Sequence, residues 1–222
     1  MSGRSLDPGG PRLRIGVLAS GRGTNLEAVL EACERGEIPG RVVVVLSDRK
    51  GALALERARR RGIPAIHVSP RSFARREEYD LRLAELLRQH EVDLVVLAGY
   101  LRYLTPPFVE AFRYRAINIH PSLLPAFPGL EAQRQALEYG VKISGCTVHF
   151  IDEELDHGPI ILQAAVPVRE DDDVASLSER ILREEHRILV EAVRLFAEGR
   201  LQVEGRRVRI LERSAAVWRR GG

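Results

Sequence analysis

The chain has 222 residues, of which 45% are hydrophobic and 29% are charged, and its formal net charge is +3. This length and composition predict a soluble globular protein with a substantial hydrophobic core. The small excess of positive charge does not indicate nucleic-acid binding, and no apolar run approaches the roughly 18–20 residues of a membrane span.

Residues 1–12 are rich in Gly, Pro, Ser and Arg, and they lack the apolar core of a secretory signal. We predict that they form a disordered N-terminal extension of a cytoplasmic protein. Its two cysteines, Cys33 and Cys146, are not part of a Cys-x-x-Cys pair. We therefore expect reduced, buried thiols and no metal site.

The first half of the chain alternates apolar runs with amphipathic segments. Strands are predicted at 13–19, 41–46, 63–68 and 92–98, and helices at 26–33, 52–61 and 75–89. This alternation predicts βαβ units in a doubly wound, Rossmann-like α/β fold whose sheet is mostly parallel. Ligands bind such sheets beyond the carboxyl ends of the strands, which points to the loops after Ala19, Ala98 and Ile119.

The second half of the chain has a different pattern. Predicted here are a short strand at 115–119, a proline-rich loop at 121–129, strands at 144–151 and 158–168, a helix at 174–198, and a hairpin of 201–203 with 207–211. The two longer strands flank an acidic turn, which predicts an antiparallel pair in the C-terminal half of the sheet. With no repeat or domain boundary, we predict one catalytic domain at 13–200, followed by a hairpin and tail at 201–222.

A glycine-rich turn follows the first strand and precedes a helix, as in many anion sites. Gly21 and Gly23 permit a tight turn, and Thr24 and Asn25 add polar side chains at the helix start, where backbone N–H groups attract negative charge. The spacing matches neither a Walker A motif nor a full Gly-x-Gly-x-x-Gly, because Leu26 takes the place of the third glycine. A single phosphate is thus favoured over a dinucleotide. The loop alone leaves open a purely structural turn with Thr24 as helix cap.

Asn118 and His120 lie two residues apart at the end of a predicted strand, so their side chains leave the same face of the sheet. An amide donor beside an imidazole can stabilise an oxyanion and transfer a proton. A lone histidine is more often structural, but the position at a strand end and the prolines that follow favour a functional role. The acidic turn contains Asp156, whose carboxylate would raise the pKa of His120 if the turn folded back on it. We expect His149 to face the same pocket.

Several motifs together resemble the glycinamide ribonucleotide formyltransferase family. In chain order they are Ala19–Leu26 (ASGRGTNL), Leu97–Arg102 (LAGYLR), Asn118–Pro125 (NIHPSLLP), Phe127–Gly129 (FPG), Val148–Phe150 (VHF) and Glu154–Pro159 (ELDHGP). The resemblance spans roughly residues 13–200. It implies the formyltransferase fold and an enzyme of purine (IMP) biosynthesis. That enzyme would transfer a formyl group from 10-formyltetrahydrofolate to the amino group of glycinamide ribonucleotide, as a monomer or homodimer and without a metal.

The resemblance also implies roles for individual residues. Those on the family's catalytic positions are Asn118, His120 and Asp156. Those on positions for the substrate phosphate and ribose are Gly23, Thr24, Asn25 and Glu185. Those on positions that hold the folate are Arg76, Leu97, Arg102, Tyr103 and Leu104, with Gly99 and Pro121 along the cleft. Protonated His120 and the Asn118 amide would stabilise the tetrahedral oxyanion. Asp156 would keep His120 charged and relay a proton through a water to the folate nitrogen.

The chain departs from the family pattern at two positions. His157 occupies a place where the family often has glycine, and we expect its side chain to point to solvent. Leu182 stands where some members have a glutamine that touches the substrate phosphate. The phosphate would then depend more on residues 23–25, with Arg22 as a further candidate.

Three alternative functions share part of this pattern. A formyltransferase acting on initiator methionyl-tRNA is expected to have a further C-terminal nucleic-acid-binding domain, yet only a short segment follows the long helix. A formyltetrahydrofolate hydrolase is expected to have an N-terminal regulatory domain and no need of a phosphate loop. A non-catalytic phosphate-binding module would explain the sheet and the loop, but not the combination of Asn118, His120 and Asp156.

Overall fold

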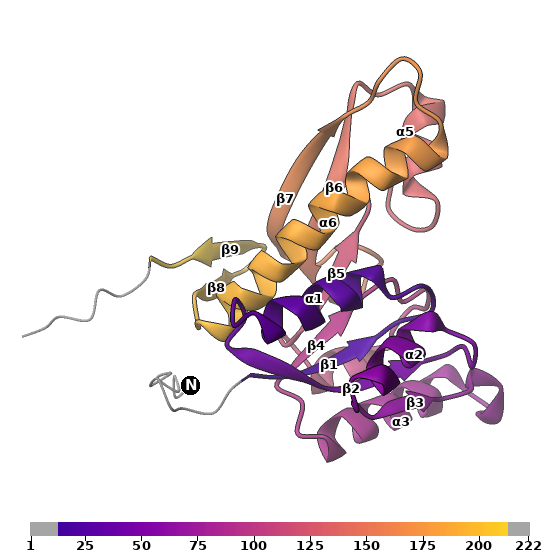
Figure 1. Cartoon of the computed structure of the whole chain (residues 1–222), viewed down its shortest axis with the longest axis vertical. Helices are drawn as coiled ribbons and strands as arrows, with labels where there is room; N and C mark the ends of the chain where they lie inside the picture. Colours follow the sequence, from indigo (N-terminus) through magenta and orange to yellow (C-terminus); the bar gives the residue numbers. More distant parts are fainter. Residues whose placement is uncertain (1–12, 213–222) are drawn as a thin grey trace, which may run out of the picture.

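The computed structural model describes residues 13–212, and within that range nine strands form a single sheet (Figure 1). The strands are β1 (Leu13–Leu18), β2 (Gly40–Ser47), β3 (Ala65–His67), β4 (Leu94–Leu97), β5 (Ala116–His120), β6 (Ile143–Phe150), β7 (Ile160–Pro167), β8 (Leu201–Glu204) and β9 (Arg207–Ile210). Their order is β3-β2-β1-β4-β5-β6-β7-β9-β8, and pairing is parallel from β3 to β5. The chain winds outward in both directions from β1 and β4, which confirms the predicted doubly wound fold.

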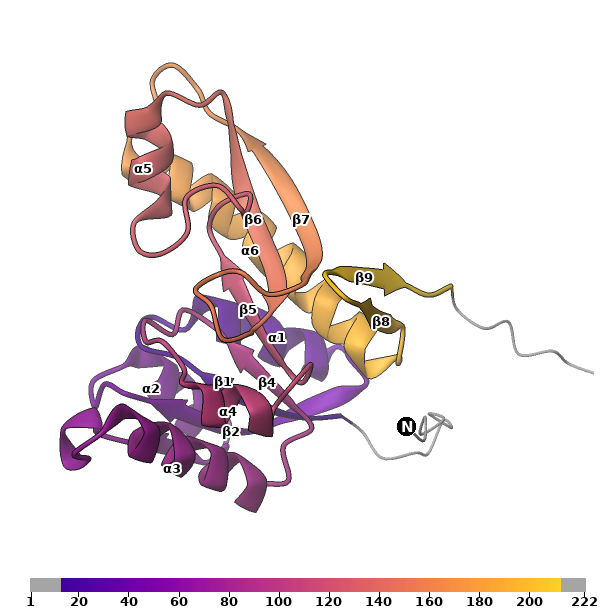
Figure 2. The same ribbon diagram turned by 180° about the vertical axis from the view of Figure 1, so that it is seen from behind.

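Helices cover both faces of the parallel part of the sheet (Figures 1 and 2). They are α1 (Thr24–Glu34), α2 (Leu53–Arg60), α3 (Arg76–Gln89), α4 (Pro106–Ala111), α5 (Ala132–Tyr139) and α6 (Val174–Ala197), with a 3-10 turn at Pro70–Ser72. Side chains of β1 alternate between two cores: Ile15 and Val17 pack with α1, α2 and α6, whereas Leu18 packs with α3 and α4. A strand buried on both faces explains the continuous apolar runs in the sequence.

The C-terminal half adds antiparallel strands, as predicted. β6 pairs antiparallel with both β5 and β7, and α6 packs along this pair (Figure 1). The predicted terminal hairpin is present as β8 and β9, and it extends the main sheet through one parallel pairing, Ile160 with Arg207. The expected disordered extension at 1–12 and the end of the tail at 213–222 lie outside the described residues.

Two helices were not predicted from the sequence. α4 has six residues and begins with Pro106 and Pro107, so its sequence resembles the proline-rich loops around it. α5 has eight residues and buries only Ala132 and Ala136, so its apolar face is too short and too small to distinguish it from a loop in the sequence. Across residues 13–212, no helix combines the length and apolar character needed to cross a bilayer.

The loops after β1 and β4 are fastened to each other at the carboxyl edge of the sheet. The Ser20 N–H donates to the Gly99 carbonyl at 3.1 Å, and the Leu101 N–H donates to Ser20 Oγ at 3.0 Å. β5 lies beside β4 and ends at His120. The three loops that the sequence selected are therefore neighbours at one edge of the sheet.

Candidate active site

A cleft of about 730 Å³ opens at this edge, and most of the predicted site residues line it. Those in its wall are Asn25, Arg76, Leu97, Arg102, Tyr103, Leu104, Asn118, His120, Asp156 and Glu185, together with Gly99, Pro121 and His149. Gly23 lies outside the wall, and Thr24 lines a separate groove between α1 and α6. One cavity therefore joins the predicted catalytic residues to the start of α1 and to the loop after β4.

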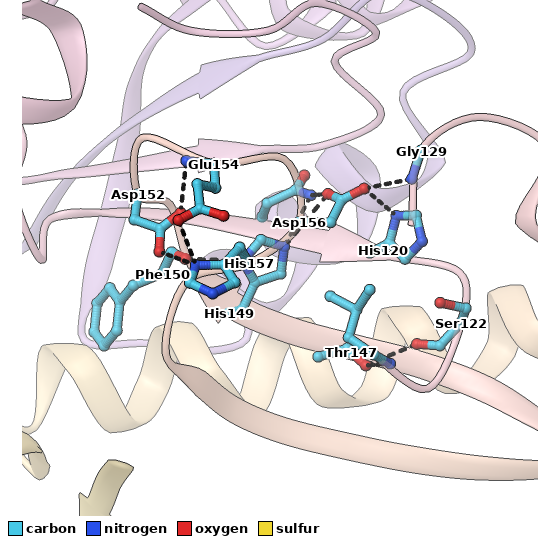
Figure 3. Close-up of polar contacts among 12 residues, drawn as sticks. His120, Ser122, Gly129, Thr147, His149, Phe150, Asp152, Glu154, Asp156 and His157 are labelled. Atoms are coloured by element: carbon cyan, nitrogen blue, oxygen red, sulfur yellow. Dashed lines mark hydrogen bonds and ion pairs between the residues drawn. The ribbon is translucent and has the colours of Figure 1, made fainter. Parts of the chain in front are cut away.

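Asp156 is the centre of the polar cluster in this cleft (Figure 3). Its Oδ2 accepts a hydrogen bond from the Gly129 N–H at 2.8 Å and lies 3.3 Å from Nδ1 of His120. Its Oδ1 accepts from Nδ2 of Asn118 at 3.3 Å and lies 3.7 Å from Nε2 of His149. The acidic turn thus folds back on His120, as the sequence predicted, and His149 faces the same pocket.

Asn118 bridges Asp156 and His149 with a single amide group. Its Nδ2 is 3.3 Å from Oδ1 of Asp156 and 3.3 Å from Nε2 of His149. The other ring nitrogen of His149, Nδ1, is 2.8 Å from the Phe150 carbonyl, which can only accept, so Nδ1 carries a proton. The resulting neutral tautomer leaves Nε2 free to accept from Asn118. His149 therefore fixes the orientation of the Asn118 amide.

Burial and hydrogen bonding set the ionisation of Asp156 and His120 in opposite senses. Burial alone would raise the pKa of Asp156, but the neighbouring His149 and His120 rings and the Gly129 N–H together lower it below its ordinary value. Burial lowers the pKa of His120, and the Asp156 carboxylate and the Phe127 carbonyl do not offset this effect. The Asp156 carboxylate does raise the pKa of His120, as the sequence analysis expected, but desolvation outweighs the ion pair and the pKa is lowered overall.

The contacts of the His120 ring nevertheless suit the protonated form. Nε2 is 2.8 Å from the Phe127 carbonyl and Nδ1 faces the Asp156 carboxylate, so both nitrogens face acceptors. Either neutral tautomer leaves one lone pair opposed to an oxygen atom. Desolvation opposes the charged ring while these two acceptors favour it, so we infer that His120 can take up a second proton when negative charge develops beside it.

The start of α1 has the features of the predicted anion site. Gly23 is the N-cap in the left-handed conformation (φ 72°), and a Cβ there would lie 2.8 Å from the Ala54 backbone. No side chain caps the helix, so Thr24 does not have the capping role that the structural alternative required. Nδ2 of the buried Asn25 donates to Oε2 of Glu185 on α6 at 2.8 Å, and Asn25 Oδ1 has no partner. Burial raises the pKa of Glu185.

Two arginines supply positive charge at the other end of the cleft. Nη2 of Arg76 donates to the Tyr103 carbonyl at 2.6 Å, and its guanidinium lies 5.7 Å from the Tyr103 ring centre. The Arg102 guanidinium lies 5.4 Å from the ring centre of Tyr79. The loop that carries Arg102 is fixed at its end by the Thr105 N–H, which donates to the Asp80 carboxylate at 2.7 Å. An anionic ligand would meet a preformed binding surface here.

Two other polar side chains near the cleft have defined partners. Oγ of Ser122 donates to the Ala126 carbonyl at 2.5 Å, so it is not paired with a base that could activate it as a nucleophile. We expected the His157 side chain to point to solvent. Its ring instead contacts both Asp152 and Arg206. Among residues 13–212, no group of three or more His, Cys, Asp or Glu side chains is arranged to hold a metal ion.

Comparison with known proteins identifies the family. Residues 13–193 match the family model described as formyl transferase. The chain belongs to the formyl transferase family. A phosphoribosylglycinamide formyltransferase of Escherichia coli K12 is 44% identical over 191 residues, which cover 86% of this chain and 90% of the relative. The crystal structure of glycinamide ribonucleotide transformylase 1 from Symbiobacterium toebii superposes with a TM-score of 0.91 at 62% identity, covering 96% of this chain and 100% of that one.

Other members of the formyl transferase family are much longer. The trifunctional purine biosynthetic protein adenosine-3 of Drosophila melanogaster is 49% identical over 190 residues, which cover 85% of this chain. The aligned region covers only 14% of that relative. The similarity is therefore confined to one part of the trifunctional protein.

Proposed function

We propose that this formyl transferase moves the formyl group of 10-formyltetrahydrofolate to the amino group of glycinamide ribonucleotide. The products would be formylglycinamide ribonucleotide and tetrahydrofolate, in the pathway to IMP. The observation that carries the proposal is the single cleft in which Asn118, His120 and Asp156 lie between the start of α1 and two arginines, Arg76 and Arg102. The names of the bacterial relatives support the same substrate.

We assign the two ends of the cleft to the two substrates. The backbone N–H groups at Gly23, Thr24 and Asn25 would bind the phosphate of glycinamide ribonucleotide, and Glu185 would bind a ribose hydroxyl. Folate would lie along Leu97, Arg102, Tyr103 and Leu104, with Arg76 near its carboxylate tail. This places the substrate amine and the formyl carbon between the two ends, beside the catalytic cluster.

The reaction would proceed through a tetrahedral intermediate without covalent attachment to the enzyme. The amine attacks the formyl carbon, and the Asn118 amide and the Nε2–H of His120 donate to the oxyanion that forms. To do so, Nε2 exchanges its present bond to the Phe127 carbonyl for one to the oxyanion. The proton lost by the amine is relayed through the ionised Asp156 carboxylate to Nδ1 of His120, while Nε2–H stays on the oxyanion, and it returns by the same route to the folate nitrogen as the C–N bond breaks.

A turnover assay with three acceptors tests this proposal. Purified protein is mixed with 10-formyltetrahydrofolate and glycinamide ribonucleotide, with initiator methionyl-tRNA, or with no acceptor, and deformylated folate is followed by absorbance. We expect turnover only with glycinamide ribonucleotide, and a formylated nucleotide product by mass spectrometry. Equal turnover without acceptor would instead show a hydrolase, and the absence of turnover in every arm would refute the enzyme assignment.

Glu185 offers a test of the ribose assignment. Because burial raises the pKa of Glu185, its protonated carboxyl contributes in full to the free energy of unfolding below the ordinary pKa of 4.5. That contribution is lost as pH rises through the raised pKa of the folded chain. Glu185→Gln should raise the KM for glycinamide ribonucleotide about 10- to 100-fold. It should also gain thermal stability relative to wild type as pH rises above 4.5. Steady-state kinetics and melting curves across pH measure both effects.

The matched control is Glu184→Gln, which removes the neighbouring carboxylate on α6 that pairs with Arg187 at the surface. It should leave the KM unchanged. A Glu185→Gln enzyme with wild-type KM would rule out the ribose contact.

The proposed partners are these two small molecules alone, with neither nucleic acid nor a membrane. We further propose a monomeric or homodimeric enzyme in the cytoplasm. Its free thiols, Cys33 and Cys146, suit a reducing compartment. Sedimentation analysis would measure the oligomeric state directly.

A further inference from the structure

The loop that carries Asp156 is held from outside by the terminal hairpin. We call residues 151–159, between β6 and β7, the Asp156 loop. Arg206, in the turn between β8 and β9, donates from Nη2 to the His157 carbonyl at 2.5 Å. Its Nη1 lies 2.9 Å from Nε2 and 3.1 Å from Nδ1 of the His157 ring. One arginine thus contacts both the backbone and the side chain next to Asp156.

The hydrogen bonds continue from Arg206 across the Asp156 loop. His157 Nδ1 is 2.8 Å from Oδ2 of Asp152, an acceptor, so Nδ1 carries the proton (Figure 3). Nε2 can then accept from Arg206. The other oxygen of Asp152 accepts from the Glu154 N–H at 3.0 Å. The three contacts form one chain of donors and acceptors: Arg206 donates to His157, His157 donates to Asp152, and the Asp152 carboxylate also accepts from the Glu154 N–H.

The backbone conformation of Asp156 explains why the loop needs such support. Its φ is 49°, in the left-handed region that side-chain-bearing residues rarely adopt. On the side away from the hairpin, the Asp156 carboxylate accepts a hydrogen bond from the Gly129 N–H, which fixes the side chain. The loop closes at Gly158, where a Cβ would lie 1.8 Å from the Phe150 carbonyl. Between these two fixed points, His157 is the residue through which the hairpin contacts the loop.

We propose that Arg206 is a positioning residue, which acts through His157 to hold Asp156 in the conformation that places its carboxylate on His120 and Asn118. The proposal rests on the function proposed above. It gives the terminal hairpin a role in catalysis, although none of its residues lines the cleft. Arg206 itself touches no reacting atom.

The expected kinetic signature is a loss of kcat without a loss of nucleotide binding. Asn25 and Glu185, the proposed nucleotide contacts, lie on α1 and α6 and do not touch the hairpin turn. A shifted Asp156 would instead misorient His120 during the transfer step. Because Arg206 is exposed, its bonds are weak, and we expect Arg206→Ala to lower kcat only about three- to tenfold.

Kinetics and hydrogen–deuterium exchange of the full chain test the proposal together. Arg206→Ala should lower kcat with little change in the KM for glycinamide ribonucleotide, and Arg206→Lys should recover part of the loss by keeping one donor to the His157 carbonyl. The control is Arg209→Ala, which removes an exposed arginine that pairs with Glu204 within the same hairpin. In Arg206→Ala alone, amide exchange should rise in peptides covering residues 151–159.

The two measurements separate this proposal from the proposed function. Exchange in the Asp156 loop can be compared whether or not the wild type turns over substrate, so an inactive wild type would refute the function and leave this test intact. Arg206→Ala with wild-type exchange, or with kcat equal to that of Arg209→Ala, would overturn the positioning role. Equal changes in kcat, both KM values and melting temperature would also overturn it, because they indicate general loosening.

Discussion

His120→Ala is expected to lower kcat by a factor between about 10² and 10⁴, with little change in the KM for glycinamide ribonucleotide. In the proposed mechanism, His120 both donates to the oxyanion and takes up the proton that the amine loses. Alanine can do neither, and the Asn118 amide remains as the only side-chain donor among the proposed catalytic residues. The nucleotide contacts at α1 and Glu185 are untouched, so ground-state binding should persist.

The measurement is single-turnover kinetics at saturating concentrations of both substrates, which isolates the transfer step from product release. His67→Ala is the matched control, since it removes an imidazole from edge strand β3, outside the cleft. Full activity of His120→Ala would exclude the proposed role. A rise in KM that accounts for the whole loss in kcat/KM would make His120 a binding residue instead.

The fold could be predicted from the sequence, and so could the edge of the sheet at which the candidate residues meet, because both follow from local patterns. Apolar runs buried on both faces predict parallel strands, and the position of His120 at the end of one such run selects the carboxyl edge of the sheet. α4 and α5 escaped prediction because each is too short for its pattern to stand out; α4 also begins with two prolines, and α5 buries only alanines. Their existence depends on packing against the rest of the chain.

Contacts between distant segments account for what the sequence could not predict in the site. The Asn25–Glu185 bond joins residues 160 positions apart, and the Arg206–His157 contact joins residues 49 apart. No motif marks Arg206, an arginine in a chain with many exposed ones. The lowered pKa of His120 was missed for a related reason, since it depends on burial by the folded chain and not on the neighbouring carboxylate alone.

Asp156→Asn is expected to reduce kcat at least a hundredfold, because a neutral amide cannot hold a proton on His120 during transfer. The variant should also change the pH profile. His120 must be neutral to accept the proton, so kcat of the wild type should fall as pH drops through the pKa of His120, below the ordinary value of 6.5. Asp156 raises that pKa, so its removal should move the acid limb to still lower pH.

Stability measurements show whether the effect is electrostatic or a loss of structure. The pKa of Asp156 is below 3.8 in the folded chain, so its stabilising contribution is present at higher pH and is lost as pH falls through the lowered value. Asp156→Asn should therefore melt at a lower temperature than wild type at neutral pH, and the difference should shrink on acidification. Asp171→Asn, which changes an exposed loop residue before α6, should alter neither profile. An acid limb that stays in place in Asp156→Asn would show that the Asp156 carboxylate does not control the protonation of His120.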